Sequence, residues 1–378
     1  MDKTRVAIIG TGIIAREHAK KYAAVDGATI VAACDILEEK LGAFCGEFGI
    51  ECSYADYRKL LERDDVDAVD ICVHNNLHAP LAIAALRSGK HCYCEKPLAG
   101  SYRDAKSIVD AAAETGKKLH VQLGTLYTNA ARAAKLLIEG GCIGTPYHAR
   151  SYGYRRRGRP FVDGYAEKEF CSKHHAGGGA LYDMGVYHIS EILHLLGCPK
   201  VSRVTGRVYQ ELTMDAKRKA ESGFDVEELG CGFVSFEGGL TLDILEAWAI
   251  NAGPFPPSMI AGTKGGLSLG DEPTLYGEAA GFPLTSKVDA AAELYRIRKS
   301  NPQAGFYAES QAHWIGALQG KCELLDTAGI ALQTMLISEG IYMSSVLNRE
   351  VTADEIVRES KPAYIRRQET PFGALEYE

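Results

Sequence analysis

The sequence has no long hydrophobic run and no long run of basic residues. No apolar stretch approaches the roughly 18 residues that a membrane span needs, and residues 1–5 lead into a strand too short for a signal peptide. The 42 basic residues are outnumbered by 49 acidic residues, giving a net charge of −7. Nucleic acid and anionic membranes are therefore not expected as partners. Repeats and low-complexity tracts are also absent, which favours an ordinary globular protein.

The cysteines do not form a pattern that indicates disulfides or a metal site. There are eleven, an odd number, and several lie in apolar or alternating segments: Cys34, Cys72, Cys92, Cys94 and Cys231. Cys92 and Cys94 share one face of a strand, but no second Cys or His pair stands nearby at metal spacing. We expect buried, reduced thiols in a cytoplasmic protein without a metal site.

The first third of the chain alternates between strand-like and helical patterns. Apolar runs at 29–34, 68–73, 91–94 and 119–123 predict strands, and 80–88 and 102–114 predict helices. This alternation is typical of a doubly wound parallel sheet covered on both faces. With 378 residues, the chain exceeds the usual size of a single core, so we expect two domains, residues 1–125 and 126–378.

The second part of the chain has a different pattern of apolar residues and glycines. Residues 201–212, 230–236, 240–250 and 258–269 are strand-like, with glycine turns between them, while 251–257 and 270–300 are expected to be loops. A long helical pattern covers 309–347. These features predict a C-terminal α/β domain with an open, largely antiparallel mixed sheet. The sequence shows no helices to cover its second face, so we expect a homodimer or homotetramer through this sheet.

A glycine turn follows the first strand. In the run Gly10-Thr11-Gly12-Ile13-Ile14-Ala15, the first glycine permits a tight turn, the second permits close approach of a pyrophosphate, and the alanine permits close helix packing. A structural βα turn is the alternative, but the strand-turn-helix context favours dinucleotide binding by residues 10–14. Asp35 ends the second strand, where it can accept hydrogen bonds from a ribose, and no Arg or Lys follows to hold a 2′-phosphate. NAD is therefore predicted rather than NADP.

Two further segments lie at the carboxyl ends of predicted strands, where ligands bind in such sheets. In Glu95-Lys96-Pro97, the lysine ends a strand and the proline fixes the turn, so the ammonium group is expected to point at the cofactor. His74, Asn75 and His78 follow the preceding strand. Asn75 is expected to bond the cofactor. His74, His78, Glu95 and Lys96 are also assigned to cofactor binding, although His78 can equally serve as a cap or packing residue.

A glycine-rich segment, residues 177–179, precedes a helix that is expected to run to Gly197. Asp183 and Tyr187 stand four residues apart and so share a helix face, where they can bind sugar hydroxyls and accept a proton. The alternative is an Asp stabilised by the helix dipole beside a core Tyr. The neighbouring His188 diverges by about 100°, so the same-face argument selects Tyr187 as the base over His188.

A basic cluster begins the loop from Arg155 to Tyr165. It is either a solvated loop or a loop that closes over a substrate or phosphate. Its arginine and aromatic side chains are available for substrate binding, to which we assign Arg156 and Tyr165, together with Tyr127.

These motifs, taken in order, resemble the family of glucose–fructose oxidoreductase, inositol dehydrogenase and MocA proteins. The resemblance is carried by the glycine turn, Asn75-x-x-His78, Glu95-Lys96-Pro97, Asp183-x-Gly185 and Gly262-Thr263-Lys264-Gly265. It implies an N-terminal Rossmann domain, a C-terminal α/β domain, and a catalytic set of Lys96, Asp183 and Tyr187.

The chain departs from the family's pattern at two places. Position 187 is commonly His in the family, whereas here it is Tyr187 followed by His188, which leaves the identity of the base open. Val73-His74 also stands where Thr-Pro is frequent, which would loosen the turn and place His74 near the nicotinamide.

The sequence thus predicts an NAD-dependent dehydrogenase acting on a sugar or glycoside hydroxyl, the 3-hydroxyl of a pyranoside being preferred. Two alternatives stay open. One is redox-neutral cleavage of a glycoside through a 3-keto intermediate and elimination, with NAD recycled. The other is a non-catalytic NAD-binding sensor or partner protein.

Overall fold

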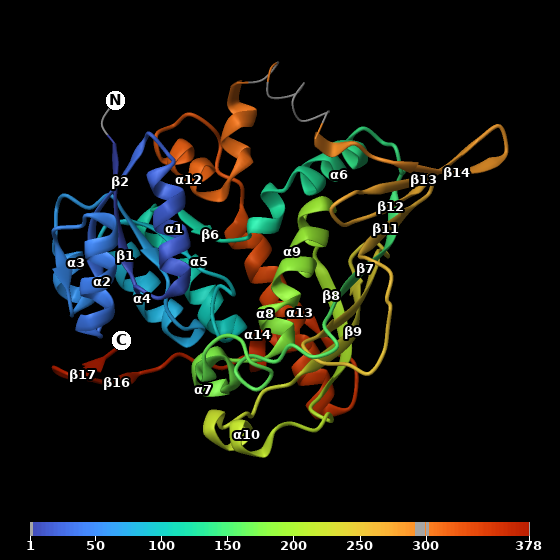
Figure 1. The fold of residues 1–378 in the computed structure, drawn as a ribbon. Helices are drawn as coiled ribbons and strands as arrows, with labels where there is room; N and C mark the ends of the chain where they lie inside the picture. The colour runs from blue at the N-terminus through green and yellow to red at the C-terminus, as the bar shows by residue number, and fades with distance from the viewer. Residues whose placement is uncertain (1–2, 292–298, 300–301, 378) are drawn as a thin grey trace. The chain divides into compact units, whose positions relative to one another are not determined.

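The computed structural model describes residues 3–291, 299 and 302–377. The chain forms two compact units (Figure 1). Unit 1 consists of the described residues within Met1–Gln122, Phe306–Ala328 and Pro362–Glu378, and unit 2 of those within Leu123–Gly305 and Gly329–Lys361. After leaving unit 1 near residue 122, the chain thus returns to it twice.

Unit 1 is built on a six-stranded sheet in the order β3-β2-β1-β4-β5-β6, with every neighbouring pair parallel. Its strands are β1 Thr4–Ile9, β2 Ala28–Cys34, β3 Ser53–Tyr54, β4 Ala68–Ile71, β5 His91–Cys94 and β6 Leu119–Val121. Its helices are α1 Ile13–Ala23, α2 Glu38–Phe48, α3 Tyr57–Leu61, α4 Asn75–Arg87, α5 Tyr102–Thr115 and α12 Ser310–Leu318. The predicted doubly wound parallel sheet is confirmed.

Helix α4 begins five residues earlier than predicted. The prediction started at Pro80 because proline is common at the first position of a helix, but Pro80 lies inside α4. Proline has no N–H, so the carbonyl of Asn76 loses its partner within the helix. The backbone N–H of Ile365, from the C-terminal segment, donates to that carbonyl at 2.9 Å. A backbone N–H from a distant part of the sequence therefore supplies the hydrogen bond that the internal proline cannot make.

The predicted long helix over residues 309–347 is two helices. α12 ends at Leu318, Gly320 follows with a φ of +69°, and α13 spans Thr327–Leu347. Trp314 and Ile315 of α12 are buried in the core of unit 1 together with Phe44 and Tyr22. By length and composition α13 is apolar enough to cross a membrane, but 56% of its most apolar window is buried inside the protein.

Unit 2 contains a nine-stranded sheet in the order β14-β13-β12-β11-β7-β10-β9-β8-β15. Its strands are β7 Pro146–Tyr154, β8 Val201–Tyr209, β9 Leu229–Phe236, β10 Thr241–Ala247, β11 Met259–Gly262, β12 Gly266–Ser268, β13 Thr274–Ala279, β14 Phe282–Lys287 and β15 Val351–Thr352. β10 runs parallel to β7, whereas the other pairs are antiparallel. The predicted mixed, largely antiparallel sheet is confirmed.

The expectation that residues 270–300 form a loop is wrong for part of this range. β13 and β14 make a hairpin there, and its turn uses Ala280 and Gly281 with φ values of +52° and +79°. The strand pattern escaped sequence analysis because β14 is exposed on both faces, so its residues do not alternate between apolar and polar.

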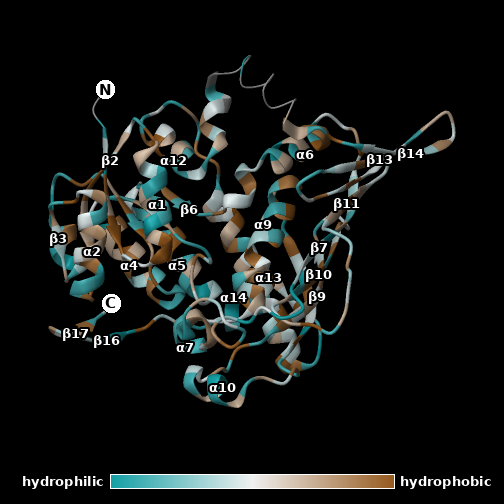
Figure 2. Cartoon of the chain, viewed as in Figure 1, coloured by the Kyte–Doolittle hydropathy of each residue, from teal (hydrophilic) through white to brown (hydrophobic). Residues whose placement is uncertain are grey.

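The remaining described helices of unit 2 are α6 Asn129–Glu139, α7 Lys173–Ala176, α8 Ala180–Asp183, α9 Gly185–Leu195, α10 Ala216–Ser222 and α14 Ala353–Glu359, together with the 3-10 turns η1 Gly124–Tyr127 and η2 Lys168–Cys171. A further turn, η3 Pro302–Ala308, and the hairpin of β16 Arg367–Thr370 and β17 Gly373–Glu376 complete the described elements. Hydrophobic residues dominate the centre of each unit, while α10 is mainly hydrophilic (Figure 2).

The two faces of the unit 2 sheet differ, as β10 illustrates. Leu242, Ile244 and Glu246 are buried on one face, whereas Thr241 and Asp243 point to the other face and are only partly buried. Glu246 is therefore a carboxylate on the buried face of a strand.

Candidate active site

The glycine turn after β1 has the geometry that a dinucleotide requires. Gly10 has a φ of +90°, and a Cβ there would lie 2.3 Å from the carbonyl oxygen of Cys72, so no other residue fits. Gly12 faces open space and immediately precedes α1, whose first residues Ile13 and Ile14 are 75% and 41% exposed. Ala15 is buried against the sheet. The turn leaves the N-terminus of α1 open to a pyrophosphate, as NAD binding needs.

Asp35 is joined to this turn by hydrogen bonds. Its Oδ2 accepts from the backbone N–H and the hydroxyl of Thr11 at 2.8 and 2.9 Å, and its Oδ1 accepts from the N–H of Leu37. The carboxylate is thereby held at the end of β2, beside the glycine turn. It is in place to accept from ribose hydroxyls and to repel a 2′-phosphate.

A buried polar chain lies beneath the predicted lysine. Nδ1 of His18 bonds Asp70 at 2.9 Å and its Nε2 bonds Glu95 at 2.8 Å, with His18 on α1, Asp70 on β4 and Glu95 directly after β5. All three side chains are buried. Burial lowers the pKa of His18, but Asp70 and Cys72 raise it by more, so the pKa lies well above its usual value. The imidazolium therefore compensates two buried carboxylates.

This chain connects to Lys96 through Glu95. Against the raising effect of burial, the bond to His18 lowers the pKa of Glu95, so the carboxylate stays ionised. Its Oε2 accepts from the backbone N–H of Lys96 at 2.9 Å. His18, Asp70 and Cys72 also bring ligand-type atoms within 4.8 Å of one another. Both imidazole nitrogens are already engaged, which fits a structural hydrogen-bond network better than a metal site.

His78 has a structural place in the same turn. It is buried on α4, and its ring nitrogens lie 2.8 Å from the carbonyl oxygen of Pro97 and 3.1 Å from that of Val73. Of the two roles left open by the sequence, packing therefore agrees with the structure. His74 is the N-cap residue of α4, and the buried Asn75 is its first residue.

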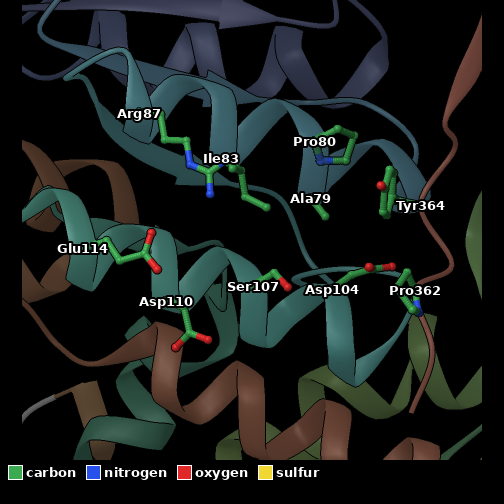
Figure 3. Close-up of a pocket in the computed structure, with 10 residues that line it drawn as sticks. All are labelled: Ala79, Pro80, Ile83, Arg87, Asp104, Ser107, Asp110, Glu114, Pro362 and Tyr364. Carbon is green, nitrogen blue, oxygen red and sulfur yellow. The ribbon is translucent and has the colours of Figure 1, made fainter. Parts of the chain in front are cut away.

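A pocket of about 310 Å³ lies elsewhere in unit 1 (Figure 3). Its lining residues come from α4, α5 and the C-terminal segment: Ala79, Pro80, Ile83, Arg87, Asp104, Ser107, Asp110, Glu114, Pro362 and Tyr364. None of the predicted site residues lines it.

In unit 2, the glycine-rich segment leads into two short helices rather than the single helix predicted. α8 ends at Asp183, Met184 intervenes, and α9 begins at Gly185. The N–H of Met184 still bonds four residues back to Ala180, but the N–H of Tyr187 bonds three residues back to Met184. Glu246 approaches the backbone closely at this irregularity. A Cβ at Gly185 would lie 3.2 Å from Cγ of Glu246.

Asp183 belongs to a polar cluster within unit 2. Its Oδ2 accepts from the indole N–H of the buried Trp248 at 2.9 Å. Burial, with the Asp183 carboxylate as the second cause, raises the pKa of Tyr165 to about 12. Arg155 donates to the Tyr165 hydroxyl at 2.5 Å and lies over the Tyr165 ring. Tyr165, at the end of this loop, is therefore close enough to Asp183 for the carboxylate to influence its pKa; substrate contact by the loop stays a prediction. The buried Tyr127 ends η1.

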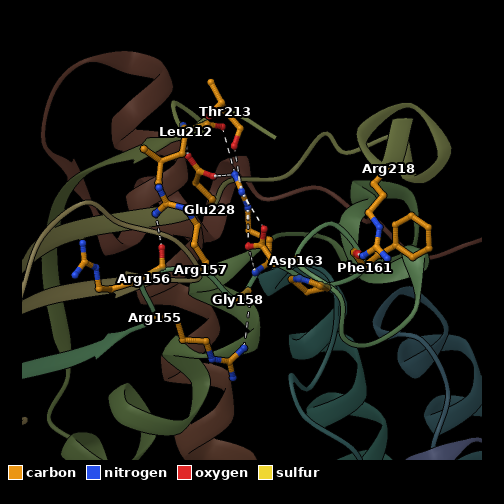
Figure 4. Close-up of polar contacts among 12 residues, drawn as sticks. Arg155, Arg156, Arg157, Gly158, Phe161, Asp163, Leu212, Thr213, Arg218 and Glu228 are labelled. Carbon is orange, nitrogen blue, oxygen red and sulfur yellow. Dashed lines mark hydrogen bonds and ion pairs between the residues drawn. The ribbon is translucent and has the colours of Figure 1, made fainter. Parts of the chain in front are cut away.

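The basic cluster of this loop makes polar contacts within unit 2 (Figure 4), and its members differ in burial. Arg155, Arg156 and Arg157 are exposed, whereas Arg159 is buried and bonds Asp163 at 3.0 Å and Glu228 at 2.9 Å. Arg218 donates to the carbonyl of Phe161 at 2.7 Å and lies over its ring. The loop is therefore anchored from within, and its fourth arginine is structural.

The sequence analysis missed three polar residues that the structure connects to predicted ones. His18 and Asp70 support Glu95, and the buried Glu246 bonds Nδ1 of His188 at 2.9 Å. Each partner lies far away in the sequence and none belongs to a motif. An Asp or Glu inside an apolar strand was the only available signal, because buried acids are rare unless paired.

Replacing His18 by glutamine tests the buried network. The change leaves two buried carboxylates without a cation, so the free energy of unfolding should fall by about 3–5 kcal/mol. Urea denaturation of both proteins measures it. The exposed His174 provides a control, because His174→Gln should change stability by no more than about 0.5 kcal/mol. Equal stability of the wild type and His18→Gln would contradict the pairing.

Comparison with known proteins agrees with this geometry. Residues 4–123 match a family model described as "Oxidoreductase family, NAD-binding Rossmann fold", and residues 131–268 match the GFO/IDH/MocA C-terminal domain. The chain is 36% identical to inositol 2-dehydrogenase of Salmonella typhimurium over 39% of its own length, a match that spans 46% of that relative.

Other similarities cover more of the chain. It is 28% identical to D-glucoside 3-dehydrogenase of Escherichia coli over 65% of this chain and 71% of that protein. A levoglucosan dehydrogenase in complex with NADH has the same fold, with a TM-score of 0.79, 22% identity and coverage of 93% of this chain and 99% of that one. The predicted fold and NAD-binding domain are thereby confirmed. The chain belongs to the Gfo/Idh/MocA family of NAD-binding oxidoreductases.

Proposed function

We propose that this protein is an NAD-dependent dehydrogenase that oxidises a hydroxyl group of a sugar or glycoside. The observation that carries the proposal is the cluster in unit 2, where Asp183 is held by Trp248 beside Tyr165 and Arg155. A carboxylate, a phenol and a guanidinium next to an indole supply the acceptors, donors and flat surfaces that a polyhydroxylated ring needs. We place the enzyme in the cytoplasm, in keeping with its eleven free cysteines.

The roles of the residues follow from their chemistry. Residues 10–14, Asp35, His74 and Asn75 bind NAD, which accepts a hydride when bound. Lys96 donates to the reacting oxygen and stabilises the negative charge that develops on it. Asp183 orients the sugar, and Tyr187, Arg156, Tyr165 and Tyr127 contribute contacts to it. Glu95 acts through Lys96, whose backbone N–H it accepts.

We propose the 3-hydroxyl of a pyranoside as the position oxidised. The support is the 28% identity to a protein named D-glucoside 3-dehydrogenase. A panel of sugars and glycosides, assayed for NADH formation, tests both the substrate class and the position. Stoichiometric NADH indicates a dehydrogenase, whereas release of aglycone without net NADH indicates the redox-neutral cleavage. NAD binding without turnover of any member would favour the non-catalytic sensor.

The cofactor preference provides a second test. Because the Asp35 carboxylate repels a 2′-phosphate and no basic residue follows it, NAD should bind at least about tenfold more tightly than NADP, or about 1.4 kcal/mol. Calorimetric titration measures both dissociation constants. Asp35→Ser should narrow the gap, and equal affinities in the wild type would refute the assignment.

Substitution of Lys96 tests the chemistry. Loss of the positioned donor in Lys96→Ala should lower kcat by about 100-fold or more, while the glycine turn continues to bind NAD. Lys59→Ala removes an exposed ammonium group from the same unit and should leave kcat unchanged. Near wild-type turnover in Lys96→Ala would exclude the catalytic role, and loss of NAD binding would make the residue structural.

We also propose that the exposed face of the unit 2 sheet joins subunits. Tyr209 on β8 and Phe233 on β9 are 40% and 41% exposed on this face, and covering them with a second copy of the sheet would remove their apolar surface from water. Light scattering at micromolar concentration should give the mass of a dimer or tetramer, and Phe233→Glu should reduce it. A monomeric wild type would contradict the proposal.

A further inference from the structure

His188 and Glu246 form a pair that runs from the interior of unit 2 to its surface. Glu246 on β10 has no exposed side-chain area, whereas the His188 side chain on α9 is 31% exposed. Nδ1 of His188 lies 2.9 and 3.1 Å from the two carboxylate oxygens. One end of the imidazole is thus fixed inside the protein, and the ring extends toward solvent.

Space for this pair is provided by a glycine. Gly153 on β7 stands opposite Glu246 in the parallel register. A Cβ at Gly153 would lie 2.2 Å from Cε1 of His188 and 2.3 Å from Oε2 of Glu246, so any other residue would displace one of them. Glycine at position 153 of β7 therefore leaves the space that the side chains of His188 and Glu246 occupy.

Glu246 depends on His188 for charge compensation. Its one other hydrogen-bond partner among the described residues is the hydroxyl of Ser151, at 3.2 Å. The buried Glu228 instead pairs with the Arg159 guanidinium, and Glu227 accepts the backbone N–H groups of Gly179 and Leu181. A buried carboxylate that is bonded only to a hydroxyl would destabilise the fold. The His188 imidazole is therefore the group that offsets the free-energy cost of burying Glu246.

The pair also sets the protonation pattern of the ring. A carboxylate accepts hydrogen bonds, so Nδ1 carries the hydrogen, and Nε2 of the neutral ring holds a lone pair. Within the part of the chain that the structure describes, no group bonds Nε2. The neutral ring therefore presents Nε2 as a proton acceptor that has no hydrogen-bond partner among the described residues.

We propose that His188, oriented by Glu246, takes the proton from the substrate hydroxyl, and that Tyr187 only binds the sugar. This inference rests on the proposed function. The O–H bond breaks and its proton joins Nε2 of His188, while the hydride on the same carbon passes to NAD and the carbon is oxidised to a ketone. Glu246 is a positioning residue that stabilises the imidazolium formed.

The charged groups that face His188 come from three elements. Glu246 lies on β10, Glu191 on α9 and Arg155 in the loop after β7. Burial lowers the pKa of His188, but Glu246 and Glu191 together raise it by more, so the pKa lies above its usual value despite Arg155. Burial also raises the pKa of Glu191 to about 7, so this carboxyl titrates in the same pH range. Oxidation needs the neutral ring, so activity should fall as the pH drops through this pKa.

The variant Glu246→Gln keeps the shape and the acceptor oxygen but removes the charge. The pKa of His188 should fall, so the acid limb of kcat/KM for sugar oxidation should move to lower pH by about one unit. A structural role alone would lower activity without moving this limb. An unmoved limb in a folded Glu246→Gln protein would overturn the proposal.

A second variant covers the case in which Glu246→Gln does not fold. His188→Gln keeps an N–H donor for the buried carboxylate, and should lower kcat by about 100-fold with unchanged NAD affinity. Tyr187→Phe should lower it by less than about tenfold. The reverse order of these two effects would return the role of the base to Tyr187.

The same strands offer a matched control. His148 on β7 pairs with Asp243 on β10 at 3.3 Å, on the other face of the sheet. His148→Asn removes a histidine–carboxylate pair without touching His188, so the acid limb should stay in place. A limb that moves equally in His148→Asn would contradict the assignment to Glu246.

Histidine-selective NMR separates this inference from the proposed function. With the His188 signal identified by its loss in His188→Gln, the wild type should titrate above the ordinary value near 6.5, and Glu246→Gln should titrate lower. This measurement needs no substrate. If no sugar reduces NAD, the proposed function fails while the pair is still tested; if sugars react but the His188 pKa is equal in both proteins, the inference alone fails.

Discussion

A carboxylate removed from water needs a cation or several hydrogen-bond donors, and this requirement organises both units of the protein. In unit 1, the His18 imidazolium lies between Asp70 and Glu95. In unit 2, Arg159 pairs with Glu228 and His188 with Glu246. In every case the acidic member lies on a strand or directly beside one in the sequence, and the other comes from a helix or loop with a predicted role in binding. Because an unpaired buried charge is destabilising, the need to form these pairs limits where the site residues can lie.

The constraint adds to the apolar packing that holds the site segments, such as the cluster of Val162, Met184 and Trp248. Both carboxylate oxygens of Glu95 accept hydrogen bonds, one from His18 and the other from the backbone N–H of Lys96. The turn that carries Lys96 is therefore fixed at its first residue. The loop after β7 is fixed by Arg159, which leaves Arg155 and Arg156 at the surface. A loop anchored by a buried arginine that pairs with two carboxylates can present several exposed polar groups in a defined arrangement, which favours recognition of a ligand with many hydroxyls.

The sequence predicts the features that depend on short-range patterns. The parallel strands, the glycine turn and the mixed sheet were all predictable, because apolar periodicity and glycine conformations act over a few residues. The start of α4 was not, because the cost of Pro80 inside a helix is met by Ile365, a residue 289 positions from Asn76 in the sequence. The break between α12 and α13 had a local signal that the sequence analysis did not use, because Gly320 follows α12 with a φ of +69° and a glycine at this position ends a helix.

The choice between Tyr187 and His188 shows the same limit at the level of chemistry. Helical periodicity relates position 187 to Asp183, but it assumes a continuous helix, and the N–H of Tyr187 bonds three residues back rather than four. Periodicity also carries no information about Glu246, which is 58 residues from His188 and reaches it only because β10 packs against α9. A proton acceptor is defined by its partner as much as by its position. For this reason the carboxylate behind His188 is the observation from which we propose His188, rather than Tyr187, as the residue that receives the proton.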